Sequence, residues 1–249
     1  MKKILITNDD GVRAPALDLL RDRLSELGKV TIAAPEGPKN AMGNSITLHK
    51  PVRVCRISAG KYSVSGSPAD CVRVGVLDIM GDSVDLVVSG INIGANLGDD
   101  VNYSGTVAGA REAALLEIPS LASSLVEDTH RNYEMAADIT FRVAREVLEN
   151  GFPRRRFLNL NIPDLPEREY PKGVCLCRLG VRIYERKVRE RVDPAGRKYY
   201  WIIGERLDNV NEKGTDFEAI RRGYAALVPL GLDYTDHELA KELKTWNLS

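Results

Sequence analysis

Apolar and polar residues alternate along residues 1–162 in blocks that predict strands and helices in turn. Residues 3–7 and 30–34 are short apolar runs, and residues 16–27 between them repeat leucine at helical spacing. A strand, a helix and a strand in so short a stretch predict a βαβ unit, whose crossover makes the two strands parallel. Gly28 is expected to end the helix as its C′ residue.

The same alternation continues through the middle of the chain. Further strands are predicted at residues 84–89, 120–124 and 157–162, with helices at 105–117 and 133–148. The predicted fold class is therefore α/β: a Rossmann-like, mostly parallel sheet with helices on both faces. Ligands of such sheets bind beyond the carboxyl ends of the strands, so candidate chemistry is sought there.

The pattern changes after Pro163, and we predict two parts. Residues 1–170 form the Rossmann-like catalytic core, and residues 171–249 form an extension. In the extension, Asp193-Pro194-Ala195-Gly196 is a turn signal between residues 183–192 and 198–203. This pattern predicts a long β-hairpin.

The rest of the extension is predicted to hold a returning core strand at residues 224–230 and a terminal helix at 235–246. Thr235 is expected to cap that helix, with Glu238 three residues later. The hairpin carries three consecutive aromatic residues, 199–201, which two strands cannot bury by themselves. A partner subunit is the economical cover for them.

Composition excludes some classes of partner. Lys plus Arg and Asp plus Glu both number 35, so no net charge attracts a nucleic acid polymer. No apolar stretch is long enough to cross a membrane, and the polar residues that follow Thr7 leave no signal-peptide core. The four cysteines form neither a C-x-x-C pair nor a dense disulfide framework. A cytoplasmic protein is expected.

The first candidate site is Asn8-Asp9-Asp10-Gly11, where the first strand ends. The adjacent carboxylates of Asp9 and Asp10 repel each other, and a hard divalent cation such as Mg²⁺ would satisfy both. The alternative is an ordinary polar turn.

Two more candidate loops follow strands. Residues 35–45 are rich in Gly, Pro and Asn, and residues 89–98 contain Asn92 and Asn96 among three glycines. The glycine spacing is not G-x-G-x-x-G, so a nicotinamide cofactor is poorly supported. Asn supplies neutral oxygens that complement carboxylates around a hard cation. An ordinary connector and a glycine-rich turn are the alternatives.

The fourth candidate is the loop of residues 102–111, which enters the helix at 105–117. Ser104 is placed to be the N-cap, and the free amides there form a phosphate site. Simple capping is the alternative. All four loops are expected at one sheet edge, where a metal and a phosphate would meet, so phosphate-ester hydrolysis is the reaction class that fits best.

Taken together, five motifs resemble the SurE family, the stationary-phase survival-protein nucleotidases, over nearly the whole chain. They are Asn8-Asp9-Asp10-Gly11, the loop from Ala34-Pro35 to Asn44-Ser45-Ile46-Thr47-Leu48, Gly66-Ser67-Pro68-Ala69-Asp70-Cys71-Val72, Val88-Ser89-Gly90-Ile91-Asn92 and Tyr103-Ser104-Gly105-Thr106-Val107-Ala108-Gly109-Ala110. The resemblance implies hydrolysis of nucleoside 5′- and 3′-monophosphates, sometimes of short polyphosphate, with one divalent cation per subunit, Mg²⁺ or Mn²⁺.

The resemblance also assigns residues. Asp9 and Asp10 match the catalytic and metal-binding pair, and Asn92 matches a third metal ligand. The family's fourth ligand, a serine, falls on Asn40, whose amide oxygen can also ligate a hard cation. The positions that match the phosphate side of the pocket are Asn96, Ser104, Gly105 and Thr106.

The family is described as dimers and tetramers built by C-terminal exchange, so a homodimer or homotetramer is expected. Two other functions stay open. One is a phosphatase that acts mainly on other phosphomonoesters or on polyphosphate. The other, from a different class, is a non-catalytic module in which Asp9 and Asp10 hold a metal-nucleotide without turnover.

Overall fold

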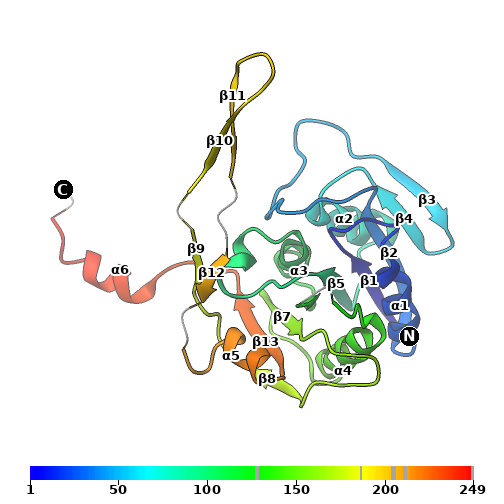
Figure 1. Cartoon of the computed structure of the whole chain (residues 1–249). Helices are drawn as coiled ribbons and strands as arrows, with labels where there is room; N and C mark the ends of the chain where they lie inside the picture. Colours follow the sequence, from blue (N-terminus) through cyan, green and yellow to red (C-terminus); the bar gives the residue numbers. More distant parts are fainter. Residues whose placement is uncertain (127–128, 186, 203–205, 210–211, 248–249) are drawn as a thin grey trace.

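A single twisted sheet organises the chain in the computed structural model, which describes residues 1–126, 129–185, 187–202, 206–209 and 212–247 (Figure 1). Within them, nine strands follow the order β3-β4-β2-β1-β5-β6-β7-β13-β8. The six strands from β4 to β7 run parallel, while β3 and β13 are antiparallel to their inner neighbours. The predicted α/β, mostly parallel fold is confirmed.

The predicted alternation of strands and helices supplies the centre of this sheet. The helices α1, α3 and α4 cross between its parallel strands. Their bounds are β1 Lys2–Thr7, α1 Pro15–Leu24, β2 Gly28–Pro35, β5 Leu86–Ile93, α3 Gly105–Leu115, β6 Ser120–Leu125, α4 Tyr133–Asn150 and β7 Arg156–Ile162.

Helices cover both faces because neighbouring residues of a strand point to opposite sides. Ile4 and Ile6 of β1 pack in the core shared with α1 and α4. Leu5, between them, packs with residues of α2 (Pro68–Val74) and α3 on the other face. Both cores are fully buried at these positions, which holds the carboxyl end of β1 in place.

Elements that the sequence pattern did not predict extend the sheet at its β2 edge. The hairpin of β3 (Val54–Ser58) and β4 (Lys61–Val64) precedes α2 and a π-helical turn, η1 (Gly75–Ile79). Every residue of β3 is exposed, so this strand carries no alternation of buried and polar positions. At the far edge, β13 (Ala225–Gly231) pairs with β7 and with β8 (Val174–Leu176).

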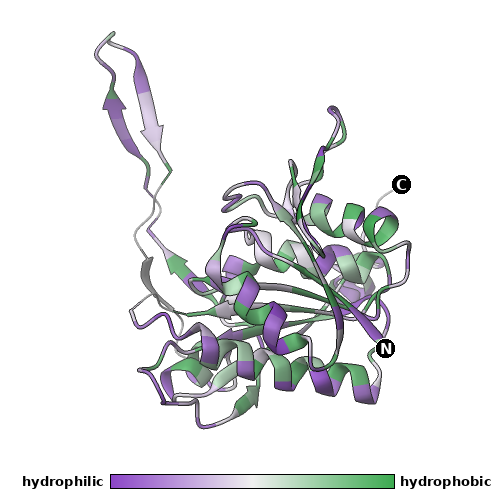
Figure 2. Cartoon of the chain, turned by 90° about the vertical axis from the view of Figure 1, so that its right-hand side faces the viewer, coloured by the Kyte–Doolittle hydropathy of each residue, from purple (hydrophilic) through white to green (hydrophobic). Residues whose placement is uncertain are grey.

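The predicted hairpin projects from the body as a two-part arm (Figures 1 and 2). Its base pairs β9 (Arg182–Tyr184) with β12 (Arg206–Asn209), and its outer part pairs β10 (Arg189–Val192) with β11 (Lys198–Trp201). The single strand expected at residues 183–192 is thus two strands, and residue 203 lies outside the described residues. The helices α5 (Asp216–Arg221) and α6 (His237–Leu243) follow, and α6 buries none of its residues.

Two predicted helix ends are wrong. α1 ends at Leu24, and Gly28 begins β2, where a Cβ would meet the carbonyl oxygen of Lys2 at 2.2 Å. Gly28 is therefore a close-packing residue of the sheet and not a C′ residue. The N-cap of α6 is Asp236 rather than Thr235, because its carboxylate accepts the amides of Glu238 and Leu239. In the described part of the chain, no helix has the length and apolar character to cross a membrane.

Candidate functional site

A pocket of about 310 Å³ opens at the carboxyl ends of β1 and β5. The chain passes from β1 to β2 on one side and later returns to β5 on the other, so β1 and β5 flank the point where the strand order reverses. The residues that line the pocket are Asp9, Asp10, Asn40, Ala41, Asn92, Ile93, Gly94, Ala95, Asn96, Asp100, Tyr103, Ser104 and Tyr184. Six of the eight predicted site residues are among them.

The two carboxylates differ in their surroundings. Asp9 is 5% exposed, and Thr106 donates to it twice, from the hydroxyl to Oδ1 at 2.5 Å and from the amide to Oδ2 at 3.2 Å. Asp10 is half-buried, and its Oδ2 is buried without a hydrogen-bond partner. One carboxylate is therefore held in place, while the other presents an unsatisfied oxygen.

Burial raises the pKa of both groups. Desolvation is the main cause at Asp9, and the hydrogen bonds from Thr106 offset part of the rise. At Asp10, burial and the neighbouring charge of Asp9 raise the pKa to about 6, partly offset by the backbone of Ile93. Two carboxylates that resist ionisation side by side form a site that a cation would stabilise.

Asn92 reaches the pocket because β5 is irregular just before it. The register between β5 and β6 shifts between Ser89 and Asn92. Gly90 lies in this shift with a φ of +138°, and a Cβ there would meet the carbonyl oxygen of Ser123 at 2.2 Å. The Asn92 side-chain amide donates to the carbonyl of Gly94 at 2.8 Å. This bond uses the nitrogen and leaves the side-chain oxygen available as a ligand.

Asn40 lies exposed on the rim, in the loop of residues 36–50 that is tied to the body at both ends. The amide of Lys39 donates to the carbonyl of Asp9 at 2.7 Å. Farther along the loop, Asp70 accepts the amide of Thr47 at 2.9 Å and its hydroxyl at 2.6 Å. Asp70 also forms the capping box of α2 with Ser67, so the first turn of that helix anchors the loop.

The start of α3 packs directly against the carboxylates. Ser104 is the N-cap, as predicted, and its hydroxyl accepts the amide of Val107. Glycines permit this approach, since a Cβ at Gly105 would lie 2.9 Å from that of Asp9 and one at Gly109 would lie 2.6 Å from Ser89 Oγ. Ser104 lines the pocket, whereas Gly105 and Thr106 lie behind Asp9 and are not part of its lining.

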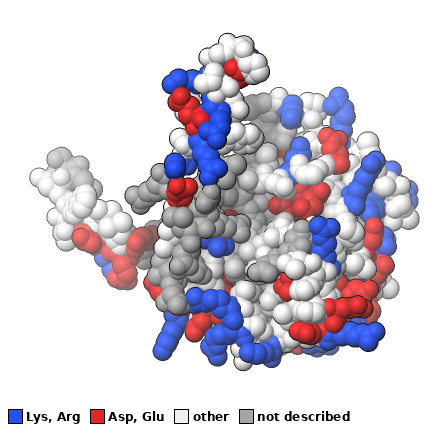
Figure 3. Space-filling view, in the orientation of Figure 1, with Lys and Arg blue, Asp and Glu red and all other residues white. Residues whose placement is uncertain are grey.

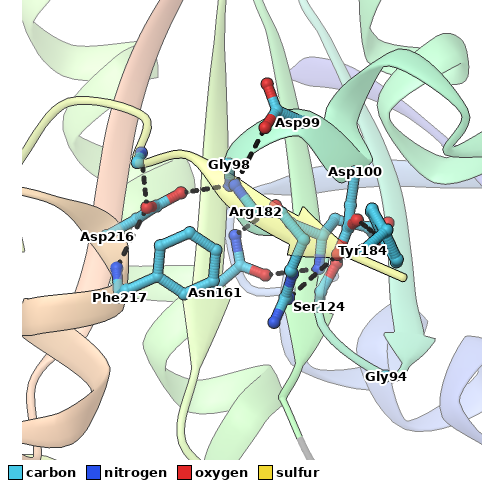
Figure 4. A network of polar contacts seen from close by, with 12 residues as sticks. Gly94, Gly98, Asp99, Asp100, Ser124, Asn161, Arg182, Tyr184, Asp216 and Phe217 are labelled. Carbon is cyan, nitrogen blue, oxygen red and sulfur yellow. Dashed lines mark hydrogen bonds and ion pairs between the residues drawn. The ribbon is translucent and has the colours of Figure 1, made fainter. Parts of the chain in front are cut away.

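Asn96 is held by polar side chains of two neighbouring strands, including Ser124 and Asn161, which are labelled in Figure 4. Asn161 on β7 accepts the Asn96 amide at 2.8 Å and donates to its carbonyl at 3.0 Å, and Asn159 donates to the same carbonyl. The Asn96 side chain donates to Ser124 Oγ on β6 at 2.8 Å. These buried hydrogen bonds hold Asn96 in place although it lies in a loop.

The donor set fits a hard divalent cation. The described residues hold no group of three or more His, Cys, Asp or Glu that could bind a metal. Two carboxylates with amide oxygens of Asn suit Mg²⁺ or Mn²⁺. The unpartnered buried oxygen of Asp10 is the observation that supports this fit.

Three side chains of the pocket, those of Asp100, Tyr103 and Tyr184, are not among the predicted site residues. Asp100 belongs to a 3₁₀ turn, η2 (Gly98–Asn102), between two of the predicted loops, and Tyr103 is the C-cap of that turn. Tyr184 comes from the base of the arm, so only the three-dimensional structure places it here. An acidic pair at residues 99–100, followed three residues later by a tyrosine, was the available signal.

Comparison with known proteins agrees with this architecture. The family model described as Survival protein SurE matches residues 4–186. The 5′-nucleotidase SurE of Geobacter sulfurreducens is 46% identical over 247 residues, covering 99% of this chain and 94% of that protein. The 5′-nucleotidase SurE of Pelobacter propionicus is 46% identical over 244 residues and 98% of each chain. The crystal structure of the SurE protein from Aquifex aeolicus has a TM-score of 0.87 at 39% identity, covering 97% of this chain and 98% of that one. With matches at this identity over nearly its full length, the chain belongs to the SurE family.

Proposed function

We propose that this protein is a metal-dependent 5′-nucleotidase that releases phosphate from nucleoside 5′-monophosphates, with nucleoside 3′-monophosphates as further substrates. The observation that carries the proposal is the pocket itself. It joins an adjacent pair of carboxylates, neutral amide oxygens and a helix N-terminus at the switch point of the sheet. The relatives named 5′-nucleotidase SurE support the same activity.

Asp9, Asp10, Asn92 and Asn40 are the residues that we assign to one divalent cation per subunit, Mg²⁺ or Mn²⁺. When bound, such a cation neutralises phosphate charge and lowers the pKa of water. Thr106 orients Asp9 through its two hydrogen bonds, which favour the ionised form of the carboxylate against the effect of burial. Asp10 contributes the oxygen that lacks a protein partner.

The substrate phosphate is assigned to the Asn96 and Ser104 side of the pocket. The positive end of the α3 dipole favours an anion there. The amides of Ser104, Thr106 and Val107 already donate within the protein, so the dipole rather than these amides supports the assignment. Ser104 and Gly105 lie at this end of the helix. Thr106 contributes indirectly, by positioning Asp9 through a hydrogen bond. The network around Asn161 keeps Asn96 from moving when the phosphate binds.

Phosphate release tests the function. Purified protein is assayed against nucleoside 5′- and 3′-monophosphates, glycerol phosphate and short polyphosphate, each with Mg²⁺, with Mn²⁺ and with chelator. We expect the highest kcat/KM for a nucleoside 5′-monophosphate and no turnover in chelator. Higher values for glycerol phosphate or polyphosphate would indicate a general phosphatase. Nucleotide binding without phosphate release would indicate a non-catalytic module.

Assembly and location belong to the same proposal. We infer a homodimer or homotetramer, because Tyr199, Tyr200 and Trp201 of the arm are all about half-exposed and α6 buries nothing within its own chain. Figure 3 shows Lys and Arg side chains gathered along this arm. All four cysteines are unpaired, which supports the reducing environment of the cytoplasm.

A further inference from the structure

We propose that Tyr184 recognises the base of the substrate, as an aromatic platform that the arm contributes to the pocket. The proposal rests on the nucleotidase function above and adds how a nucleotide is told from a simpler phosphate ester. Tyr184 lines the pocket together with the residues assigned to the metal and the phosphate. It belongs to β9, more than seventy residues after the other lining residues in the sequence, and is 38% exposed.

The hydroxyl of Tyr184 donates to Asp100, and both residues line the pocket. Asp100 accepts the tyrosine hydroxyl on Oδ1 and the guanidinium of Arg182 on Oδ2, the latter at 2.9 Å. Figure 4 shows these side chains side by side next to Asn161 and Ser124. Both carboxylate oxygens of Asp100 are engaged and its charge is paired, so Asp100 does not oppose a bound phosphate.

Arg182 is itself fixed, which makes the position of Tyr184 definite. Its side chain is 11% exposed, and its guanidinium carbon lies 4.6 Å from the centre of the Phe217 ring. The backbone amide of Arg182 donates to Asp99 Oδ2 at 2.8 Å. β9 is therefore held to η2, whose C-cap Tyr103 directly precedes Ser104.

A second anchor lies beneath the same segment. The buried carboxylate of Asp216 accepts the amides of Gly98 at 2.7 Å and of Gly180 at 2.9 Å. Phe217 packs closely on both glycines, since a Cβ at either one would lie within 2.7 Å of its ring. The base of the arm and the wall of the pocket are thus one rigid unit, joined on both sides of Arg182.

A fixed aromatic ring beside a phosphate site matches a nucleoside monophosphate. Stacking of a base on an aromatic side chain tolerates every base because each has a π-face, and its loss costs about 1–3 kcal/mol per base. The Tyr184 hydroxyl donates to Asp100, so it does not add a hydrogen bond that would select one base. We therefore expect purine and pyrimidine nucleotides to be accepted alike, and sugar phosphates without a base to be poorer substrates.

The test compares AMP and CMP with ribose 5-phosphate, which lacks only the base. In the wild type we expect kcat/KM to be roughly tenfold higher for the nucleotides. Tyr184→Leu should reduce this preference about tenfold, because KM should rise much more for the nucleotides than for ribose 5-phosphate. Tyr184→Phe, which keeps the ring and loses the hydroxyl, should retain the preference. Tyr170→Leu, at an exposed tyrosine outside the pocket, is the matched control.

Each outcome of this comparison either supports or overturns the proposed role of Tyr184. An unchanged preference in Tyr184→Leu, or an equal loss in Tyr184→Phe, overturns the platform and assigns Tyr184 to holding the arm. If circular dichroism shows that Tyr184→Leu does not fold, Tyr184→Met replaces it, because its flexible side chain also lacks the ring. The same two readings then apply. A wild type that hydrolyses AMP and ribose 5-phosphate equally overturns base recognition alone. A wild type that releases no phosphate from any nucleotide overturns the nucleotidase function instead.

Discussion

Thr106 donates a hydrogen bond to each carboxylate oxygen of Asp9, from its hydroxyl to Oδ1 at 2.5 Å and from its amide to Oδ2 at 3.2 Å. Both groups are buried, and these hydrogen bonds lower the pKa of Asp9 against the larger rise that burial causes. α3 thereby orients a residue at the end of β1. The contact explains why a hydroxyl residue at the start of α3 matters even though it does not line the pocket.

Replacing this hydroxyl tests the contact. In Thr106→Val, a charge-assisted hydrogen bond is lost at constant shape, so metal affinity should fall roughly tenfold or more. The pKa of Asp9 should rise, because one of the interactions that lower it is gone. Metal titration by calorimetry and phosphate release measure the two effects. Thr106→Ser is the control that keeps the hydroxyl, and a Val variant that titrates like the wild type would refute the role.

The Asp10 carboxylate should support activity while lowering the stability of the metal-free protein. Asp10→Asn is expected to abolish most activity, yet to raise the melting temperature of the metal-free protein. Its pKa is raised to about 6 in the folded state, mainly by burial and by Asp9. A carboxyl group with a raised pKa costs stability when ionised, so the gain in the Asn variant should be full above about pH 6. It should disappear as the pH falls from there toward the ordinary value of 3.8.

The measurement is thermal unfolding in chelator at both ends of that pH window. Saturating cation should reverse the order, since binding stabilises only a folded protein that keeps its ligand. A lower melting temperature of Asp10→Asn in chelator above pH 6 would show that the unpartnered Oδ2 has a favourable contact in the metal-free protein.

Asp70 should control the loop that carries Asn40. Burial raises the pKa of Asp70, but hydrogen bonds from Thr47 and Ser67 outweigh it, and the net pKa is lowered. The stability that Asp70 contributes is therefore present above its ordinary pKa and is lost as the pH falls through its lowered value. Asp70→Asn should cost about 1–3 kcal/mol in the free energy of unfolding at neutral pH.

Urea unfolding at pH 7 and at low pH measures this cost, which should shrink on acidification. Thr47→Val is the matched variant, because it removes only the loop's own hydroxyl bond of 2.6 Å. It should weaken metal binding with a smaller loss of stability. Equal stability of Asp70→Asn and wild type at pH 7 would contradict the anchor.

Asn40 is the ligand whose assignment departs from the family's serine. Asn40→Ser should retain metal affinity because a side-chain oxygen is kept, whereas Asn40→Leu should weaken it roughly tenfold. Asn40 is exposed on the rim, so neither variant should change stability by more than about 0.5 kcal/mol. Calorimetric titration with Mn²⁺ separates the two variants, and wild-type affinity in Asn40→Leu would remove Asn40 from the ligand set.

The sequence predicted the parallel core and six lining residues because both depend on one rule. Buried parallel strands read as apolar runs, and the loops after them meet at one edge. Asp9 follows β1, and Asn92 lies at the carboxyl end of the adjacent strand β5, so strand order brings together two residues far apart in sequence. The assignment of Ser104 as N-cap needed only local chemistry, and it is confirmed.

What was missed depended on tertiary contacts. β3 is exposed throughout and α2 has seven residues, so neither shows a usable period. Gly28 reads as a helix stop until its neighbour Lys2 is known. Tyr184 and Arg182 both bind Asp100 at the pocket, across more than eighty positions, and no local pattern encodes such a pairing.

Removing the outer arm should reduce the size of the assembly. The register pairs Arg189 with Trp201 and Arg191 with Tyr199, so one face of the β10–β11 hairpin combines guanidinium and aromatic groups. Such residues dominate the centres of protein interfaces, and a two-stranded ribbon cannot bury them alone. Deletion of residues 185–202, with a short glycine-serine turn in their place, should give smaller particles by light scattering. The metal site lies in the parallel sheet, so Mn²⁺ affinity should be retained within about threefold. A wild type that is already monomeric at micromolar concentration would contradict assembly through the arm, and unchanged particle size in the deletion would shift the interface to α6 or the body.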